Sequence, residues 1–378
     1  MPSKKLDTTW KADPHTIAKI TILEAYLQVW FQIMGRSMAG QDIVYIDGFA
    51  GPGEYANYPK GSPIAALDAA KASLALVGQQ WKAGNIHCVF IESDGKRFTH
   101  LQQVIAGIEN HNRVKVHLIH ASFIEGVSKL HGELPLAFND ICPLFVFIDP
   151  FGATGVSFTA VKDILKSPCS EVLLNFDADG IARIYCAAED ANSDTLLNEI
   201  FGDGRWKSSL AGIRDFKGQC LQILNLYKQN LRRLPKIRYV FAFEMRSRSS
   251  SLNYYLVFAS QHHLGLEKMK EAMKKVDQSG NYHFSDADVD QTLIRFDKPE
   301  NYSPLMFSLC QGKTVTYDEL RDYALNETPF INPKSMLKDL EGKNLIHVDS
   351  RDKKRRKGTF NEENIIHITF KRGGTSGH

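Results

Sequence analysis

The chain has 378 residues, of which 43% are hydrophobic and 24% are charged, a composition that excludes a disordered protein and provides for one large domain and a smaller one. Its 46 basic and 43 acidic residues give a net charge of +3, which is too small to require a nucleic-acid partner by itself. No apolar stretch follows the basic N-terminal residues and no later run is long enough to cross a bilayer, so we expect a cytoplasmic protein with no membrane partner.

The first part of the chain has the pattern of an α/β domain. Apolar residues recur at helical spacing between Pro14 and Met34, so we expect a helix there, packed on the edge of a sheet. From Ile43 to Asp177, short apolar runs alternate with helical segments, which predicts a parallel sheet covered on both faces. The expected strands are Ile43–Asp47, Ile86–Glu92, Val114–Ile119, Leu144–Asp149 and Glu171–Phe176.

Helices are expected between these strands, and a hairpin after them. Ser62 precedes Pro63 and is expected to be the N-cap of the first of these helices. A mostly helical insertion at about 190–234 is followed by two strands, Ile237–Met245 and Asn253–Ser260, which should pair antiparallel at one end of the sheet because their connection is too short for a crossover helix. The helices expected between the strands are Pro63–Val77, Lys96–Glu109, Phe123–Leu130 and Phe158–Leu165.

From about Tyr302 the pattern changes to three short helices followed by two strands. This is the order of a winged helix, so we expect a Rossmann-like α/β domain at 1–298 and a winged-helix-like domain at 299–378. The expected elements of the second domain are the helices Pro304–Cys310, Tyr317–Leu325 and Asn332–Gly342, and the strands Leu345–Val348 and Ile365–Phe370.

The turn between the last two strands is strongly basic. Arg351–Gly358 holds six basic residues within eight positions, a charge density that suits a nucleic-acid phosphate backbone. A solvated loop or a wing that binds protein is the alternative. The candidate nucleic-acid contacts are Lys353, Lys354, Arg355, Arg356 and Lys357.

The cysteines and histidines do not form a metal-binding pattern. The sequence has no CxxC pair, and the neighbouring side chains of His262 and His263 diverge, so we expect core thiols and no metal site. The six cysteines are Cys88, Cys142, Cys169, Cys186, Cys220 and Cys310.

Three strand ends carry residues suited to a ligand. The first ends in Asp47-Gly48-Phe49-Ala50-Gly51-Pro52-Gly53, where small residues let backbone amides approach a ligand and glycine takes positive φ at little cost. Glu92 ends the second strand and could accept hydrogen bonds from ribose hydroxyls or cap a helix. Asp149-Pro150-Phe151-Gly152 ends the fourth strand and could instead be only a turn. Because the carboxyl ends of parallel strands meet at one edge, the three should converge on one crevice.

Together these residues resemble the class I S-adenosylmethionine-dependent methyltransferases, over roughly Ile43–Ser260. The resemblance implies that the glycine turn cradles the methionine part of S-adenosylmethionine, that Glu92 holds its ribose, and that the fourth strand end faces the methyl group. Ser122 stands where many relatives have an acid that binds adenine. The residues this assigns to the cofactor are Asp47, Gly48, Phe49, Ala50, Gly51, Gly53, Glu92 and Ser122, and the catalytic candidates are Asp149, Pro150 and Phe151.

A narrower resemblance is to the three-Cys-motif partner proteins, a bacterial and phage-associated group named for a neighbouring protein that carries the cysteines. It is carried by the strings YIDGFAGPG, GSP, FIESD, FIDPFG and NYYLVFAS. It implies a three-Cys-motif protein as a possible partner.

We expect methyl transfer from S-adenosylmethionine to a nucleic-acid acceptor, with a polar loop from Asn175 to Arg183 lining the acceptor side and the segment Glu54–Lys60 as a lid. The fourth strand end departs from the DPPY of exocyclic-amine methyltransferases. A non-catalytic adaptor on the same fold is therefore the main alternative. A different nucleotide enzyme is disfavoured because the sequence lacks GxGxxG.

Overall fold

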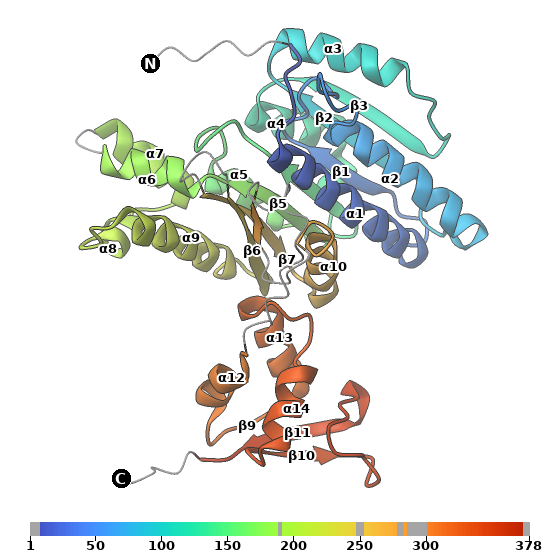
Figure 1. The fold of residues 1–378 in the computed structure, drawn as a ribbon. Helices are drawn as coiled ribbons and strands as arrows, with labels where there is room; N and C mark the ends of the chain where they lie inside the picture. Colours follow the sequence, from blue (N-terminus) through green and yellow to red (C-terminus); the bar gives the residue numbers. More distant parts are fainter. Residues whose placement is uncertain (1–7, 188–190, 247–252, 278–282, 286–300, 373–378) are drawn as a thin grey trace. The chain divides into compact units, whose positions relative to one another are not determined.

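The computed structural model describes residues 8–187, 191–246, 253–277, 283–285 and 301–372. They form two units, the first built from the described residues up to 285 and the second from 301–372 (Figure 1). Each unit has its own sheet and its own buried core, so each is described by itself.

The first unit is built around an eight-stranded sheet (Figure 1). Its strands are β1 (Ile43–Asp47), β2 (Ile86–Glu92), β3 (Val114–His120), β4 (Leu144–Ile148), β5 (Ser170–Phe176), β6 (Tyr239–Arg246), β7 (Asn253–Ser260) and β8 (His283–Ser285). They lie in the order β3-β2-β1-β4-β5-β7-β6-β8. Strands β1 to β5 are parallel, and β7 runs antiparallel to both of its neighbours. The first seven strands have the order 3-2-1-4-5-7-6 of a methyltransferase-like Rossmann sheet, which confirms the predicted fold class of this unit.

The apolar runs in the sequence determine the central strands. Every residue of β1, β2 and β4 is buried, as expected for parallel strands covered on both faces. The strand bounds agree with prediction within two residues, and the hairpin of β6 and β7 is confirmed. Strand β8, which pairs parallel with β6, was not predicted, because three residues are too few to show a period.

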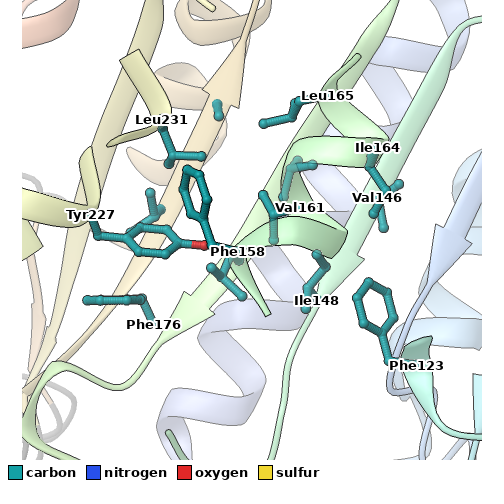
Figure 2. Close-up of a cluster of buried hydrophobic side chains, with 14 of the residues drawn as sticks. Phe123, Val146, Ile148, Phe158, Val161, Ile164, Leu165, Phe176, Tyr227 and Leu231 are labelled. Atoms are coloured by element: carbon teal, nitrogen blue, oxygen red, sulfur yellow. The ribbon is translucent and has the colours of Figure 1, made fainter. Parts of the chain in front are cut away.

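One face of the sheet is covered by helices that follow the strands. Figure 2 shows part of this core, where the ring of Tyr227 packs against Phe158 and Phe176 at centroid distances of 5.7 and 4.4 Å. The predicted helical insertion is confirmed, but it starts earlier, so the expected polar loop between Asn175 and Arg183 is mostly helix. The helices on this face are α4 (Phe123–Glu133), α5 (Phe158–Leu165), α6 (Ala178–Cys186), α7 (Ala191–Phe201), α8 (Trp206–Leu210) and α9 (Phe216–Arg232).

Helix α1 (Pro14–Ser37) lies over the opposite face, with α2 (Ser62–Val77) and α10 (His263–Met273) as its neighbours. The ring of Tyr26 on α1 lies 5.1 Å from Phe145 of β4 and 5.5 Å from Phe258 of β7, both in the middle of the sheet. The prediction that this helix packs on the sheet edge was therefore wrong. Because α1 packs against the sheet and also against α2 and α10, it buries a wide arc of its surface, whereas an edge helix buries a narrow stripe.

The start of α2 also differs from prediction. The N-cap is Gly61, not Ser62, and no side chain caps this helix. A Cβ atom at Gly61 would lie only 2.3 Å from the carbonyl oxygen of Gly53, so the close approach of these two segments requires glycine. The amide of Gly61 donates to that carbonyl at 2.8 Å, which joins the glycine turn to the start of α2.

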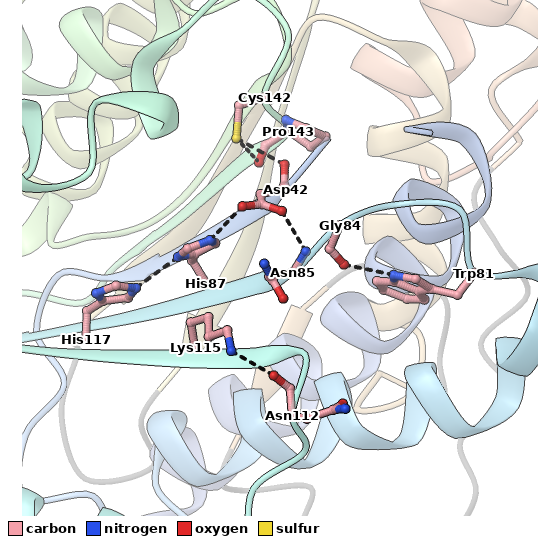
Figure 3. A network of polar contacts seen from close by, with 10 residues as sticks. All are labelled: Asp42, Trp81, Gly84, Asn85, His87, Asn112, Lys115, His117, Cys142 and Pro143. Atoms are coloured by element: carbon pink, nitrogen blue, oxygen red, sulfur yellow. Dashed lines mark hydrogen bonds and ion pairs between the residues drawn. The ribbon is translucent and has the colours of Figure 1, made fainter. Parts of the chain in front are cut away.

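Polar side chains tie the first three strands together near their amino ends (Figure 3). The Asp42 carboxylate accepts the Asn85 amide at 2.6 Å and lies 3.0 Å from His87 Nε2. His87 Nδ1 lies 2.9 Å from His117 Nε2 on β3. Burial and the neighbouring His87 lower the pKa of His117, so this histidine is neutral at physiological pH.

The described part of the second unit packs three α-helices and three strands around a small apolar core. They are α12 (Ser303–Cys310), β9 (Thr314–Val315), α13 (Tyr317–Glu327), α14 (Lys334–Gly342), β10 (Ile346–Ser350) and β11 (Ile365–Phe370). The strands form an antiparallel sheet in the order β10-β11-β9. The three predicted helices and two predicted strands are present, and β9 is an addition of two residues.

The cysteines are free thiols in three kinds of environment. Cys88, Cys142 and Cys220 are buried as predicted, Cys169 and Cys310 are half-buried, and Cys186 is exposed, so Cys186 is not the core thiol that was expected. Within the described ranges, no group of three or more histidine, cysteine or acidic side chains is placed to hold a metal ion. Among the helices of the same ranges, none is both long and apolar enough to span a membrane.

Candidate active site

The glycine turn after β1 has the backbone geometry that its sequence predicts. Gly51 has φ of 62° and Gly53 has φ of 89°, both in the left-handed region that favours glycine. The Ala50 amide donates to the Ile91 carbonyl at 2.9 Å, which joins the turn to β2. The turn is therefore fixed against the end of the neighbouring strand.

Asp47 is a buried carboxylate directly beneath this turn. Its Oδ1 accepts the Phe49 amide at 3.2 Å, whereas Oδ2 is buried and accepts no hydrogen bond from the residues that the structure describes. Burial raises the pKa of Asp47 to about 7, helped by the charges of Asp149 and Glu92 and opposed by the Ser62 hydroxyl and the Phe49 amide. A buried acceptor without a donor is a place for a hydrogen-bonding or cationic group of a ligand.

Glu92 holds the other side of the turn. Its Oε2 accepts the Gly51 amide at 2.9 Å and its Oε1 accepts the Asp94 amide at 2.7 Å. The side chain is 4% exposed, and the Arg97 guanidinium lies 3.9 Å away. Asp94, not Glu92, caps α3 (Gly95–Ala106). A carboxylate oxygen can accept two hydrogen bonds and each oxygen of Glu92 accepts one backbone amide, so Glu92 retains acceptor capacity for a ligand.

Asp149, at the end of β4, is already paired within the protein. Lys19 Nζ on α1 donates to both of its oxygens, at 2.8 and 2.6 Å, and the Asn175 side chain at the end of β5 donates to Oδ1 at 2.7 Å. The side chains of Lys19 and Asp149 are 11% and 24% exposed, so the pair is only partly screened by water.

The sequence reasoning missed Lys19. Its position one helical turn before Leu23 places a cation on the apolar stripe of α1, which is the sequence feature that could have identified it. Its partner could not be found in this way, because Asp149 is 130 residues away.

Phe151 and Pro150 follow Asp149 in different environments. Pro150 is buried, whereas Phe151 is 56% exposed, which is unusual for a large apolar side chain. The Arg97 guanidinium lies 4.9 Å from the Phe151 ring, and the Trp10 ring lies 5.6 Å away, edge to face. The predicted catalytic motif thus presents one aromatic face at the edge of the sheet.

The segment before α1 lies against the expected lid. The Ala56 amide donates to the Trp10 carbonyl at 2.9 Å. The amide of Ala12 donates to the side chain of Asn57 at 2.6 Å, and that side chain donates back to the Ala12 carbonyl at 3.0 Å. Trp10 also contacts the Tyr55 ring at 5.5 Å. The two segments form one covering layer next to Phe151, which the sequence did not predict.

Further aromatic rings lie near Lys19, the partner of Asp149. Tyr254 of β7 has the Lys19 ammonium 5.7 Å from its ring centroid and the His15 ring at 5.2 Å. Phe284 of β8 lies 5.4 Å from His15. These side chains come from α1, β7 and β8, so only the fold brings them to the carboxyl end of β4.

Comparison with known proteins finds similar solved structures at low sequence identity. No protein-family model and no curated protein matches this chain. Among solved structures, Trm1 from Pyrococcus horikoshii in complex with S-adenosyl-L-methionine is 11% identical with a TM-score of 0.38, over 73% of this chain and 62% of Trm1. An O-methyltransferase from Bacillus cereus in complex with SAH is 12% identical with a TM-score of 0.35, over 66% of this chain and 83% of that enzyme. This chain thus spans less than two thirds of Trm1. The fold class rests on the strand order given above.

Two of the predicted cofactor residues serve local structure. Ser122 is the N-cap of α4, where its hydroxyl accepts the Glu125 amide and donates to the Glu125 side chain in a capping box. The sequence Ser-x-x-Glu is the usual signature of this motif. Gly48 lies against α4, and a Cβ atom there would be 2.5 Å from the Phe123 ring. The Ser122 hydroxyl is therefore bonded within the chain, and Gly48 is required for the close packing of α4.

The five candidate nucleic-acid contacts in the basic turn of the second unit divide into one half-buried and four exposed residues. Arg355 forms an ion pair with Glu341 of α14, donates to the Thr359 carbonyl at 2.7 Å, and is 14% exposed. Glu341 also accepts the Gly358 amide at 2.7 Å. Arg355 therefore stabilises the turn from within. The exposed members are Lys353, Lys354, Arg356 and Lys357.

Proposed function

We propose that the first unit is an S-adenosylmethionine-dependent methyltransferase. The observation that carries the proposal is the convergence of Asp47, Glu92 and Asp149 at the carboxyl ends of three adjacent strands, β1, β2 and β4, around a left-handed glycine turn. This is where the strand order reverses, and open α/β sheets bind their ligands at such a point.

The residues present fit this cofactor. The unpaired buried oxygen of Asp47 suits the ammonium of the methionine part, and the remaining lone pairs of Glu92 suit ribose hydroxyls. The left-handed Gly51 and Gly53 keep side chains away from the same space. When bound, S-adenosylmethionine supplies a methyl group on a sulfonium centre.

On the acceptor side, Lys19 and Asn175 hold Asp149 by three hydrogen bonds in one orientation. An Asp149 held in this way accepts a hydrogen bond from the N–H or O–H of the acceptor and orients its lone pair toward the methyl group. Orientation alone accounts for a large part of the rate of such a displacement. Phe151, with its exposed ring, offers a face on which a planar acceptor would stack.

We propose a nucleic acid as the acceptor, bound through the second unit. The support is the cluster of exposed basic residues on the turn between β10 and β11, which includes Lys353, Lys354, Arg356 and Lys357, and the helix and strand order typical of a winged helix. The alternative is a non-catalytic adaptor that binds nucleic acid or a neighbouring three-Cys-motif protein. One observation favours it, namely that Asp149 already has partners within the chain.

The first experiment is calorimetric titration of S-adenosylmethionine into the full chain and into Glu92→Gln. The variant removes the charge and keeps one acceptor oxygen for the Gly51 amide, while the hydrogen bond from the Asp94 amide is lost. We expect binding that weakens by about tenfold or more in Glu92→Gln, since a hydrogen bond to a charged group contributes about 1.5–3 kcal/mol. The exposed Glu125→Gln serves as the matched control and should bind like the unaltered protein. No binding to the unaltered protein would refute the proposal.

The second experiment separates the enzyme from the adaptor. Labelled methyl transfer to DNA and RNA is measured for the unaltered chain and for Asp149→Asn, which keeps an acceptor oxygen but loses the ion pair with Lys19. We expect transfer that falls at least about 100-fold in the variant, with cofactor affinity unchanged. Cofactor binding without transfer to either nucleic acid would favour the adaptor.

A further inference from the structure

A cavity lies in the first unit at the opposite end of the sheet from the candidate active site. It has a volume of about 340 Å³ and is lined by the carboxyl half of α1, the start of β5 and the start of α10. Tyr26, Trp30, Ile33 and Met34 form an aromatic and aliphatic wall. Its size and apolar lining are those of small-molecule sites in proteins.

One buried carboxylate, Glu171, lies in the wall of this cavity. Its Oε2 accepts the Tyr26 hydroxyl at 2.5 Å and its Oε1 accepts the Ser260 hydroxyl at 2.8 Å. Burial raises its pKa, and these two hydroxyl donors oppose that shift. A Cβ atom at Gly265 would lie 2.0 Å from Oε1, so glycine at the start of α10 is what leaves room for the carboxylate.

Glu171 has no cationic partner among the residues that the structure describes. An uncompensated buried charge is costly, and the free energy is recovered when a cation pairs with it. Lys268 at the rim does not fill this role, because it is paired with Glu267 at 3.5 Å and with Glu271 at 3.0 Å. The rings of Tyr26 and Trp30, which line the same cavity, also favour a cation.

We propose that this cavity is a second binding site, for an apolar amine whose ammonium group pairs with Glu171. The apolar body of the ligand would lie against α1. The site is independent of methyl transfer, since it uses none of the residues at the carboxyl ends of β1, β2 and β4. Glu171 and Asn175 lie on the same strand, about 13 Å apart.

Cys169 provides a direct test because it lines the cavity and is a free thiol. The full chain is alkylated with N-ethylmaleimide in the presence of 2-phenylethylamine or its uncharged counterpart 2-phenylethanol, and each cysteine is followed by peptide mass spectrometry. At about ten times its Kd, the amine should slow alkylation of Cys169 roughly tenfold, by mass action. Exposed Cys186, which lies outside the cavity, is the internal control and should react at an unchanged rate.

The role of Glu171 is tested in Glu171→Gln, which preserves the size of the side chain. In this variant the amine should protect Cys169 no better than the alcohol does. The matched control Glu271→Gln removes a carboxylate that pairs with Lys268 but does not line the cavity, and it should keep the preference for the amine. Equal protection by amine and alcohol in the unaltered protein would overturn the proposal, and so would an alkylation rate of Cys169 that neither compound changes.

Discussion

At the scale of the residue, Asp47 carries an energetic cost that a ligand would relieve. Its carboxylate is fully buried, and its pKa rises from 3.8 to about 7. A shift of this size corresponds to about 4 kcal/mol of differential stabilisation between the protonated and ionised forms. The ionised form of Asp47 is therefore unfavourable in the folded protein without a ligand. Carboxylates with strongly shifted pKa values are common at binding and catalytic sites.

This pKa predicts how stability depends on pH in the absence of a ligand. The folded pKa lies above the unfolded value, so the folded state binds more protons between about pH 4 and 7, and stability falls as pH rises through this window. Relative to Asp47→Asn, the unaltered protein should lose about 3 kcal/mol of unfolding free energy between pH 5 and pH 8. Urea unfolding followed by tryptophan fluorescence reports on the correct unit, because all four tryptophans precede residue 207. A constant difference between the two proteins would contradict the prediction.

The same group predicts the pH dependence of cofactor binding. A ligand ammonium favours the ionised form of Asp47, so S-adenosylmethionine should bind more weakly as pH falls below 7, by up to about tenfold per pH unit. Calorimetry at pH 5.5, 6.25 and 7 measures this slope. Asp47→Asn should bind more weakly at pH 7 and show no slope. If the affinity depended on pH equally in both proteins, the group that titrates would not be Asp47.

At the scale of the element, the turn between β10 and β11 is held by one buried ion pair. Glu341 on α14 accepts from Arg355 and from the Gly358 amide, and the Phe360 ring lies 5.3 Å from the guanidinium. The basic side chains of the turn repel one another, and the carboxylate of Glu341 offsets part of this repulsion. One inward-facing arginine thus fixes the backbone and leaves its basic neighbours exposed.

Removing the acid should therefore loosen the turn. Glu341→Ala removes the only carboxylate that the described residues pair with half-buried Arg355, and breaking a largely buried ion pair in this way costs about 3 kcal/mol. Hydrogen exchange of the β10 and β11 amides should speed up, whereas exchange in the first unit should not change. Lys353→Ala, an exposed substitution in the same turn, is the control. Equal exchange in both variants would show that the ion pair does not hold the turn.

At the scale of the whole molecule, we assign cofactor binding to the first unit and nucleic-acid binding to the second. The three converging carboxylates lie in the first unit and the exposed basic cluster lies in the second. A net charge of +3 conceals this division, because the acidic and basic residues nearly cancel over the whole chain. Nucleic-acid affinity and cofactor affinity should consequently respond to different substitutions.

Replacing four exposed basic residues of the turn, Lys353, Lys354, Arg356 and Lys357, by glutamine tests this division. The slope of log K against log salt for duplex DNA should fall by about 3 to 4, as expected for the loss of four phosphate contacts. The Kd of S-adenosylmethionine should stay the same. The control is a set of four exposed lysines in the first unit, Lys129, Lys162, Lys166 and Lys217, changed in the same way. Equal loss of slope in both sets would show that binding is not localised to the turn.

The sequence by itself determined the parts of this protein that depend on neighbouring residues. Continuous apolar runs predicted the buried strands β1, β2 and β4, because a fully buried strand needs apolar side chains on both faces. Glycines at Gly51 and Gly53 predicted a left-handed turn, since glycine alone adopts that backbone at little cost. Asp47 and Glu92 were predicted as ligand-binding candidates because they end β1 and β2.

The tertiary structure decided the pairings between residues that are distant in the sequence. The partner of Asp149 is Lys19, 130 positions away, and the partner of Glu171 is Tyr26, 145 positions away. Both depend on α1 lying over a face of the sheet, where the sequence had suggested an edge. Periodicity shows that one side of a helix is buried, but not which surface covers it, because that is settled only by the packing of all elements together.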